Sequence, residues 1–328
     1  MTHAPSLRDK IVASIDLARQ APSVHNSQPW RVRLTGDVLT ISINWKRAVT
    51  HGDPTKRQTY MSLGIFTEAI IAACAVHNLT VSKPKLERDS VVLKVEEAQA
   101  KTTRVAKYES VLAKRTTDRS IYSKATYPRK VLDGIRRSGE GIPARAWLLT
   151  DESAIEFIAK NTSKAINLAI SNPGFRNELS EFLIEPWSDK KTGISVKSLY
   201  IPLPIAVAEP FILRHGIALS LEPKLEYRRW ASSSGVVCIT TKGDLEQSWF
   251  HAGRKYMAVS LGIESFGISQ ATSAALVEAS TFHEDVEELL GTSERLQAVI
   301  RFGKGKNQRH HSPRLPLSEI LTEPTSNQ

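Results

Sequence analysis

GIFTEAIIAACAVHNL, residues 64–79, decides the fold, because residues 253–268 repeat its pattern as GRKYMAVSLGIESFGI. Each stretch begins with a glycine, runs for sixteen residues to an aliphatic one, and carries Asn78 or Gly267 at an equivalent place. Asparagine and glycine favour the C-terminal end of a helix. Both stretches are apolar nearly all round, which is typical of a helix buried between two layers. The sequence therefore predicts two equivalent core helices.

β-strand patterns flank both helices in the same order. Val38–Ile43 and Val91–Val95 lie before and after the first helix. Val236–Thr240 and Ala298–Phe302 take the same places around the second. A repeated strand–helix–strand order is typical of a duplicated chain, so we expect two related halves that pack around a shared helical core. The expected fold class is α+β.

The two expected halves differ in length. The first covers residues 1–103, the second covers residues 104–322, and residues 323–328 form a tail that we expect to be flexible. Within the second half, residues 173–225 are rich in proline with interspersed aromatic residues and have no counterpart in the first. Long segments of this kind inside compact domains are commonly lids or interface arms. We therefore expect residues 173–225 to form a lid or such an arm.

Composition places the chain among globular proteins. Of its 328 residues, 41% are hydrophobic and 24% are charged, near the globular average. No apolar run approaches the roughly 20 residues of a membrane span, and the N-terminus lacks the basic start and apolar stretch of a signal peptide. The cysteines Cys74 and Cys238 lie in predicted buried elements without a pairing motif. These features favour a cytoplasmic protein without a membrane partner.

The net charge of +10 raises the question of an anionic partner. The basic residues are scattered, and the sequence contains neither a recognition helix nor an aromatic RNA-binding motif. A small anionic ligand is therefore favoured over a nucleic acid. The pair His310-His311 has no acidic or cysteine partner at metal-ligand spacing, so we expect no metal site.

The first chemical motif follows the opening helix, which a capping box at Ser6–Asp9 begins and Pro22 ends. Residues 21–31 read APSVHNSQPWR. They resemble the AlaProSer-x-x-Asn-x-GlnProTrp segment of the nitroreductase superfamily, which turns against the isoalloxazine ring of FMN. The resemblance implies cofactor contacts from Pro22, Ser23, Val24, Asn26 and Gln28. The segment alone also fits a proline-ended helix before a buried tryptophan, and His25 fits either a contact with the ring or substrate or a cap of the turn.

Residues 114–119 read KRTTDR and resemble the superfamily's Arg-x-Ser-x-Lys/Arg signature, with Thr117 in place of the serine. The resemblance implies that Arg115 and Thr117 hold the FMN phosphate and that Arg119 lies near the pyrimidine edge of the flavin. Arginine binds phosphate through forked, charge-assisted hydrogen bonds of about 1.5–3 kcal/mol each. A cation beside the pyrimidine stabilises the anionic reduced flavin. A basic stretch after a helix also fits a solvated helix end.

Two further segments extend the resemblance. Residues 312–317 read SPRLPL and resemble the closing Lys-x-Arg-x-Pro segment of the superfamily. Ser312 stands where the lysine is usual, which leaves Arg314 as the implied phosphate ligand. Ser269 and Gln270 follow the second core helix, at the place where the superfamily sets backbone groups against the flavin ring.

The order of these motifs differs from that of a dimeric nitroreductase, in which one subunit supplies the AlaProSer segment and the other supplies the basic segments. Here the first half carries the AlaProSer segment and the second half carries the basic ones. This tandem layout resembles the Acg-like subgroup. It implies a nitroreductase-like fold whose two tandem halves mimic the usual homodimer, with one FMN site per chain and a monomer sufficient to build it.

The resemblance implies an NAD(P)H-dependent oxidoreductase that reduces nitroaromatic or quinone-like acceptors by two electrons. FMN carries that chemistry at its N5 atom, so no catalytic side chain is expected. The alternative is an Acg-like protein that sequesters or stores FMN beneath a lid and turns over little. A third class, a basic nucleic-acid-binding protein, would be colourless and would bind DNA with a steep salt dependence.

Overall fold

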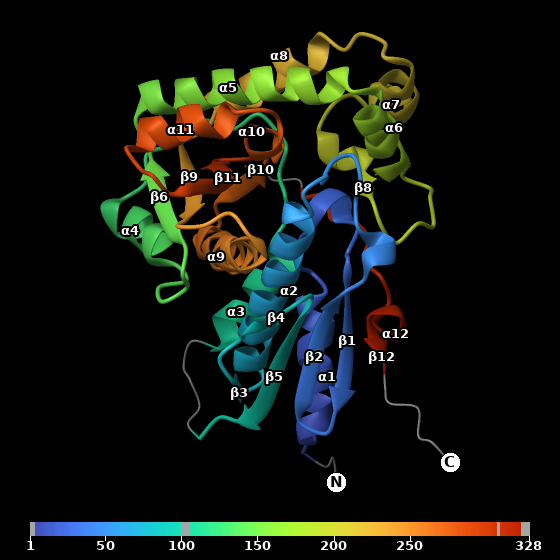
Figure 1. Ribbon diagram of the computed structural model, residues 1–328, viewed down its shortest axis with the longest axis vertical. Helices are drawn as coiled ribbons and strands as arrows, with labels where there is room; N and C mark the ends of the chain where they lie inside the picture. The colour runs from blue at the N-terminus through green and yellow to red at the C-terminus, as the bar shows by residue number, and fades with distance from the viewer. Residues whose placement is uncertain (1–3, 100–104, 307–308, 323–328) are drawn as a thin grey trace.

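Two helices cross at the centre of the molecule (Figure 1). The computed structural model describes residues 4–99, 105–306 and 309–322. The central helices are α2 (Arg57–Val76) and α9 (Glu246–Ser265), each of twenty residues, and each packs against a sheet of its own half. Both are longer than the sequence predicts, because each begins seven residues before the glycine that opens the repeat (64 − 57 and 253 − 246).

The crossing of α2 and α9 explains the two glycines. A Cβ atom on Gly64 would lie 2.1 Å from the carbonyl oxygen of Phe250, and one on Gly253 would lie 2.0 Å from that of Met61. Each glycine faces the residue three positions before the other glycine, so the contact is symmetric between the helices (253 − 250 and 64 − 61). Only a residue without a side chain lets the two backbones approach this closely.

Both central helices end three residues before the predicted aliphatic residue, at Val76 and Ser265, and the predicted caps follow them. Asn78 and Gly267 have φ angles of +56° and +70°, the left-handed conformation found just beyond a helix C-terminus. Glycine adopts this conformation freely, and asparagine is among the few other residues that tolerate it. Each lies fourteen residues after its crossing glycine (78 − 64 and 267 − 253), so the symmetry extends to the helix ends.

The first half forms a sheet in the order β1-β2-β5-β3, with β12 beside β1 and β4 beside β5. Neighbouring strands are antiparallel except β12, which runs parallel to β1 and brings the C-terminal segment back to the first half. The strands are β1 (Trp30–Thr35), β2 (Val38–Ile43), β3 (Leu79–Val81), β4 (Leu86–Glu87), β5 (Ser90–Glu97) and β12 (Leu321–Thr322).

The second half forms an antiparallel sheet in the order β6-β9-β11-β10. This order matches β1-β2-β5-β3 strand for strand, and the central helix enters the chain at the same point in both halves. The fold is therefore α+β with two related halves, as the sequence predicts. The strands are β6 (Arg145–Leu149), β9 (Gly235–Thr241), β10 (Ser269–Thr272) and β11 (Arg295–Gly303).

The halves differ most at one connection. A tight turn at Gly36 joins β1 to β2, whereas residues 150–234 join β6 to β9. We call residues 150–234 the insertion. It includes residues 173–225, and most of it is helical. Its elements are α5 (Glu152–Ser171), α6 (Pro173–Phe182), β7 (Leu183–Ile184), β8 (Ile194–Ser195), the 3-10 turn Val196–Leu199, α7 (Leu203–His215) and α8 (Leu221–Ala231).

The other helices surround this frame. The first, α1, begins with the capping box that the sequence predicts, in which Ser6 and Asp9 exchange hydrogen bonds. These helices are α1 (Leu7–Ala18), α3 (Val105–Lys114), α4 (Arg129–Arg137), α10 (Ala275–Glu278), α11 (Phe282–Leu290) and α12 (Leu317–Ile320), with 3-10 turns at Val24–Asn26 and Trp45–Arg47. The tail predicted at residues 323–328 lies outside the described residues.

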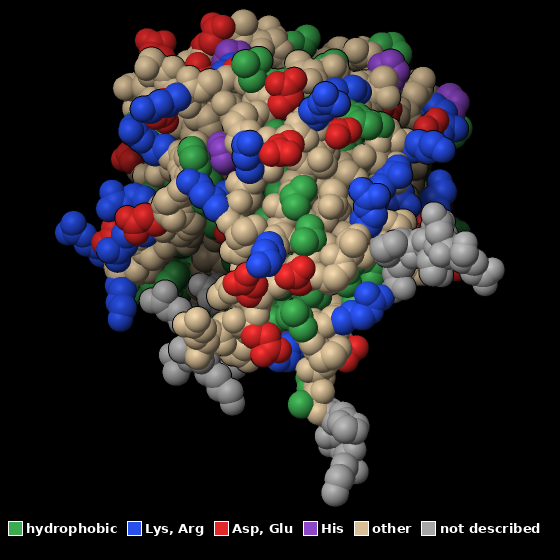
Figure 2. Space-filling view, turned by 60° about the horizontal axis from the view of Figure 1, so that its bottom comes forward, with side chains coloured by type: hydrophobic (Ala, Val, Ile, Leu, Met, Phe, Trp, Pro, Cys, Tyr) green, Lys and Arg blue, Asp and Glu red, His purple; other side chains and the backbone are tan. Residues whose placement is uncertain are grey.

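The burial of α2 and the distribution of surface charge bear on two classes that the sequence argues against, membrane proteins and nucleic-acid-binding proteins. Within the described ranges α2 is long and apolar enough to cross a membrane, contrary to the sequence expectation, but 72% of its most apolar window is buried inside the molecule. A core helix has this property. On the face shown in Figure 2, lysine and arginine side chains are interspersed with acidic ones and do not form a single stripe.

Candidate functional site

The segment after α1 forms a strained turn, residues 22–28. His25, Asn26 and Gln28 have positive φ angles of +46°, +54° and +50°. Such conformations cost free energy in residues other than glycine and persist only where surrounding contacts fix them. One such contact closes the turn itself, because the backbone N–H of Gln28 donates to Oγ of Ser23 at 2.9 Å.

Asn26 joins the strained turn to two distant segments. Its Nδ2 donates to the carbonyl oxygens of Gly193 and Pro313, both at 2.9 Å, and its Oδ1 accepts from Arg314 at 3.0 Å. Both amide hydrogens are thus bound within the protein. Asn26 therefore braces the turn against the insertion and the C-terminal segment. Of the cavity and the small basic recess described below, it lines the recess alone.

Gln28 is a second brace. It is fully buried, its Nε2 donates to the carbonyl oxygen of Lys191 at 2.7 Å, and its Oε1 accepts from the backbone N–H of Leu315 at 2.9 Å. Gln28 lines neither the cavity nor the recess that are described below. The structure thus places this predicted cofactor contact behind the site, where it fixes the same two segments as Asn26.

A cavity of about 570 Å³ lies against the strained turn. This volume is within the range of ligand and cofactor sites. The first half, the second half and the insertion all contribute to the wall, so the cavity is composite. Its lining includes Pro22, Ser23, Val24 and His25 of the turn, Gln58, Met61, Ser62 and Ile65 of α2, Tyr256 of α9, residues 271–275, and Phe175, Leu179 and Leu213 of the insertion.

A recess of about 60 Å³ adjoins this cavity and is basic. The two share Pro22, Ser23, His25, Thr117, Arg119 and Ile194 as lining residues, which places them side by side. The remaining wall of the recess consists of Asn26, Arg115, Thr116, His310, His311, Ser312 and Arg314. No carboxylate occurs in this wall among the residues that the structure describes.

Arg115 and Arg314 make the recess electropositive. Arg115 is 3% exposed, and its Nε has no hydrogen-bond partner within the described part of the chain. Burial lowers the pKa of Arg314 to about 9, and the charges of Arg115 and Arg19 act in the same direction. Buried guanidinium groups of like charge are unfavourable without a counter-ion. A bound phosphate would supply that counter-ion and would also accept the free N–H of Arg115.

Thr117 and Arg119 lie where the cavity and the recess meet, since both line each of them. Arg119 donates to Oγ of Ser198 in the insertion at 3.3 Å. Tyr256 faces the same cavity from α9, and sequence reasoning missed it. Burial raises the pKa of Tyr256, although the charges of Arg115 and Arg119 oppose the rise. A tyrosine in an apolar helix carries no sequence signal that separates it from the core.

Ser269 and Gln270 lie on β10 but line neither the cavity nor the recess. The carbonyl oxygen of Gln270 accepts from the backbone N–H of Asp118 at 2.8 Å, which ties the strand to the basic segment. The residues that reach the cavity, Ala271–Ala275, follow directly. The cavity therefore meets β10 only at its C-terminal end, at Ala271 and Thr272.

His25 lies between the turn and the insertion. Its ring is 5.4 Å from that of Phe182 and 6.2 Å from that of Phe175, measured between centroids. Burial lowers the pKa of His25 to about 4, so the ring is neutral at pH 7. In the described ranges, no group of three or more His, Cys, Asp and Glu side chains is placed to hold a metal ion.

No family model matches the chain. A Mycobacterium tuberculosis protein named "Putative NAD(P)H nitroreductase acg" is 21% identical over 326 residues, which cover 95% of this chain and 95% of that protein. An uncharacterized protein of the same organism is 24% identical over 321 residues, covering 93% of this chain and 90% of that one.

Solved nitroreductase structures show a limited similarity to this chain. The FMN-dependent nitroreductase NfnB from Mycobacterium smegmatis, in complex with NADPH, has a TM-score of 0.43 at 15% identity and covers 65% of this chain and 96% of its own. A nitroreductase with bound FMN from Desulfitobacterium hafniense has a TM-score of 0.40 at 10% identity, covering 65% of this chain and 95% of its own.

Proposed function

We propose that the chain belongs to the nitroreductase superfamily, binds one FMN in the composite cavity and works as an NAD(P)H-dependent oxidoreductase. The proposed acceptors are nitroaromatic or quinone-like compounds. One observation carries the proposal: Arg115, which is buried, and Arg314, which is half-buried, line a recess whose described wall holds no carboxylate. An anionic group that enters this recess leaves the rest of its molecule in the adjoining cavity of about 570 Å³.

In this proposal the recess takes the phosphate of FMN. Arg115 and Arg314 would bind it through charge-assisted hydrogen bonds, with the hydroxyl of Thr117 beside them. Pro22–Val24, Ala271–Ala275 and Arg119 line the adjoining cavity and would hold the flavin ring there. FMN supplies hydride transfer when bound, and the protein supplies position, charge and exclusion of water.

The composite wall supports one site per chain. The strained turn belongs to the first half, whereas Arg115, Arg119 and Arg314 follow residue 103 in the second. Together with the matching strand orders, this supports a duplication with a boundary near residue 103 and a functional monomer. The thiols of Cys74 and Cys238 are free and buried. They are compatible with a reducing cytoplasm, the compartment that we propose for the protein.

A second candidate is FMN sequestration with little turnover. The insertion favours it, because α5, α6, α7 and α8 all contribute to the cavity wall. A wall of this kind would exclude a nicotinamide or an acceptor if it stayed in place. The two candidates share the FMN site and differ only in access to it.

The test measures flavin content and reduction in the purified protein. We expect one FMN per chain and bleaching of the oxidised flavin when NADH or NADPH is added without oxygen. Flavin that dithionite bleaches, but that neither nicotinamide does, would favour sequestration. Protein that takes up no FMN on reconstitution would reject both candidates.

A further inference from the structure

Helix α6 of the insertion packs along one face onto the strained turn and the loop 49–52. Gly174, Phe175, Glu178 and Phe182 form this face, because residues about four apart lie on the same side of a helix. Phe175 and Phe182 contact the ring of His25, as their centroid distances show. Phe175 and Leu179 of the same helix line the cavity. The position of α6 therefore sets one wall of the site.

Glu178 makes the polar contact of this face. Its Oε2 accepts from the backbone N–H groups of Thr50 at 2.7 Å and His51 at 2.9 Å, and its Oε1 accepts from that of Gly52 at 2.6 Å. Successive N–H groups that converge in this way form a nest for an anion. Burial acts to raise the pKa of Glu178, but the three N–H donors outweigh it and hold the pKa below its ordinary value. The carboxylate is therefore charged at pH 7.

Two glycines make the packing close. A Cβ atom on Gly174 would lie 2.7 Å from Nδ1 of His51, so the backbone of α6 rests directly on the loop. A Cβ atom on Gly52 would lie 3.1 Å from Cε1 of His25 and 3.2 Å from Oε1 of Glu178. Gly52 thus lies between the strained turn and the carboxylate, and the loop, the turn and α6 form one packed unit.

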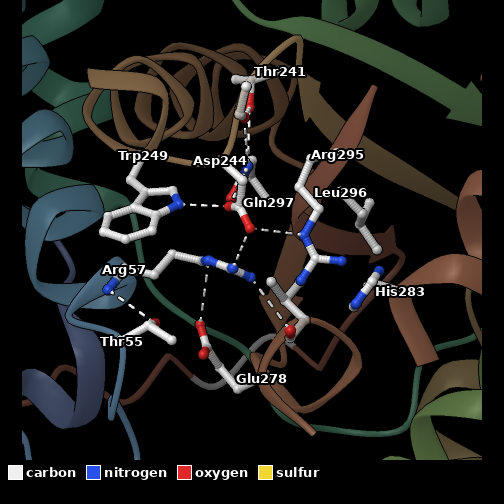
Figure 3. A network of polar contacts seen from close by, with 12 residues as sticks. Thr55, Arg57, Thr241, Asp244, Trp249, Glu278, His283, Arg295, Leu296 and Gln297 are labelled. Carbon is white, nitrogen blue, oxygen red and sulfur yellow. Dashed lines mark hydrogen bonds and ion pairs between the residues drawn. The ribbon is translucent and has the colours of Figure 1, made fainter. Parts of the chain in front are cut away.

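The loop 49–52 leads into the first turn of α2, which a polar network holds to the second half (Figure 3). Arg57, 4% exposed, donates to Asp244 at 2.9 Å, and Arg295 donates to the same carboxylate at 3.2 Å. Figure 3 shows the guanidinium of Arg57 directed between Asp244 and Glu278. The helix that follows the nest is therefore fixed to the second half, and the loop offers α6 a support.

We infer that Glu178 is a positioning residue, which latches α6 to the nest at residues 50–52 so that cofactor and acceptor pass only when this latch opens. The inference rests on the proposed function, since it concerns access to the same cavity. It assigns that access to one carboxylate rather than to the insertion as a whole.

The test replaces Glu178 by glutamine and uses Glu181→Gln as the matched control. Glu181 is exposed on the same helix, so both variants lose one negative charge. In flavin-free protein, we expect the amides of Thr50, His51 and Gly52 to exchange with deuterium about tenfold faster in Glu178→Gln, because hydrogen bonds to a charged group are lost. In the FMN-loaded protein, we expect flavin release, followed by its fluorescence, to quicken by about tenfold as well.

If the loaded enzyme turns over, the KM of the acceptor is expected to change in Glu178→Gln more than kcat. Glu181→Gln should match the parent protein in each measurement. Unchanged amide exchange in Glu178→Gln would overturn the latch. Faster exchange with unchanged flavin release would overturn its control of access. Failure of the parent protein to take up FMN would reject the proposed function. Amide exchange at residues 50–52 and in α6 would then test only whether Glu178 holds α6 in place.

Discussion

The two halves of the chain share a frame and differ in what is built on it. Both order their strands in the same way, and both bring a glycine to the crossing of α2 and α9. At the equivalent connection, the first half has a tight turn at Gly36, whereas the second has residues 150–234. A symmetric core can therefore carry an asymmetric site, because the core fixes the two halves while the connections between their strands can differ in length.

The site uses this asymmetry directly. The first half contributes the strained turn with its three positive φ angles, and the second contributes the buried arginines and the insertion. The C-terminal segment then crosses back, since β12 pairs with β1 and Arg314 contacts Asn26. Each half therefore depends on the other to complete the cavity.

Substitution of the two crossing glycines tests the symmetry of the frame and should change stability the most. Gly64→Ala and Gly253→Ala should each destabilise the protein by about 3 kcal/mol or more, because the added Cβ would meet a carbonyl oxygen of the facing helix. The helix propensity of alanine offsets only about 1 kcal/mol. Gly262→Ala is the control, since its Cβ would meet the side chain of Ser138, which can rotate.

Urea unfolding of the three variants measures this. Equal losses for Gly64→Ala and Gly253→Ala would sharpen the equivalence of the halves. A loss within about 1 kcal/mol for either one would contradict the close crossing, since overpacking of backbone against backbone costs more.

The second effect tests the asymmetry. Arg115→Met should weaken FMN binding by about a hundredfold, because a buried phosphate would lose two charge-assisted hydrogen bonds. Lys114→Met removes the same charge from the neighbouring exposed position and should leave the affinity unchanged. Titration of flavin-free protein with FMN, followed by flavin fluorescence, measures both.

The stability of the flavin-free Arg115→Met protein supplies a second readout. It should change little, because burial and the like charge of Arg314 disfavour the parent arginine, while Glu264 offsets part of this. FMN affinity equal to that of the parent protein would remove Arg115 from the site.

The smallest effect concerns the contact between the strained turn and the insertion. Burial lowers the pKa of His25 from its ordinary 6.5 to about 4. Unfolded His25 therefore binds a proton before the folded residue does, and stability is lost as the pH falls from 6.5 towards 4. At pH 5 the free energy of unfolding is lower than at pH 7 by roughly 1 kcal/mol from His25, after allowance for the partial exposure of its ring.

His25→Asn should flatten this part of the pH dependence, and asparagine suits the positive φ at that position. His215→Asn, at an exposed histidine of α7, is the control. Unfolding free energies measured between pH 5 and pH 7 test the prediction. A slope as steep in His25→Asn as in the parent protein would show that other groups carry it.

The sequence determined the frame of this protein. The apolar helices 64–79 and 253–268, their C-terminal caps and the flanking strands are local patterns, because periodicity and backbone preference act over a few residues. Three arginines and a threonine of the predicted site, Arg115, Thr117, Arg119 and Arg314, all line the recess. They could be predicted because charge and hydroxyl chemistry in a recognisable motif can be read without coordinates.

Tertiary structure alone decided how these parts meet. It placed Gln28 against Lys191 and Leu315, brought residues 271–275 and Tyr256 to the cavity, and set Glu178 of α6 on the loop 49–52. The nest at residues 50–52 and its carboxylate are separated by 126 to 128 residues of sequence. Such contacts depend on the packing of whole elements, and no local pattern encodes which distant side chain will face a given turn.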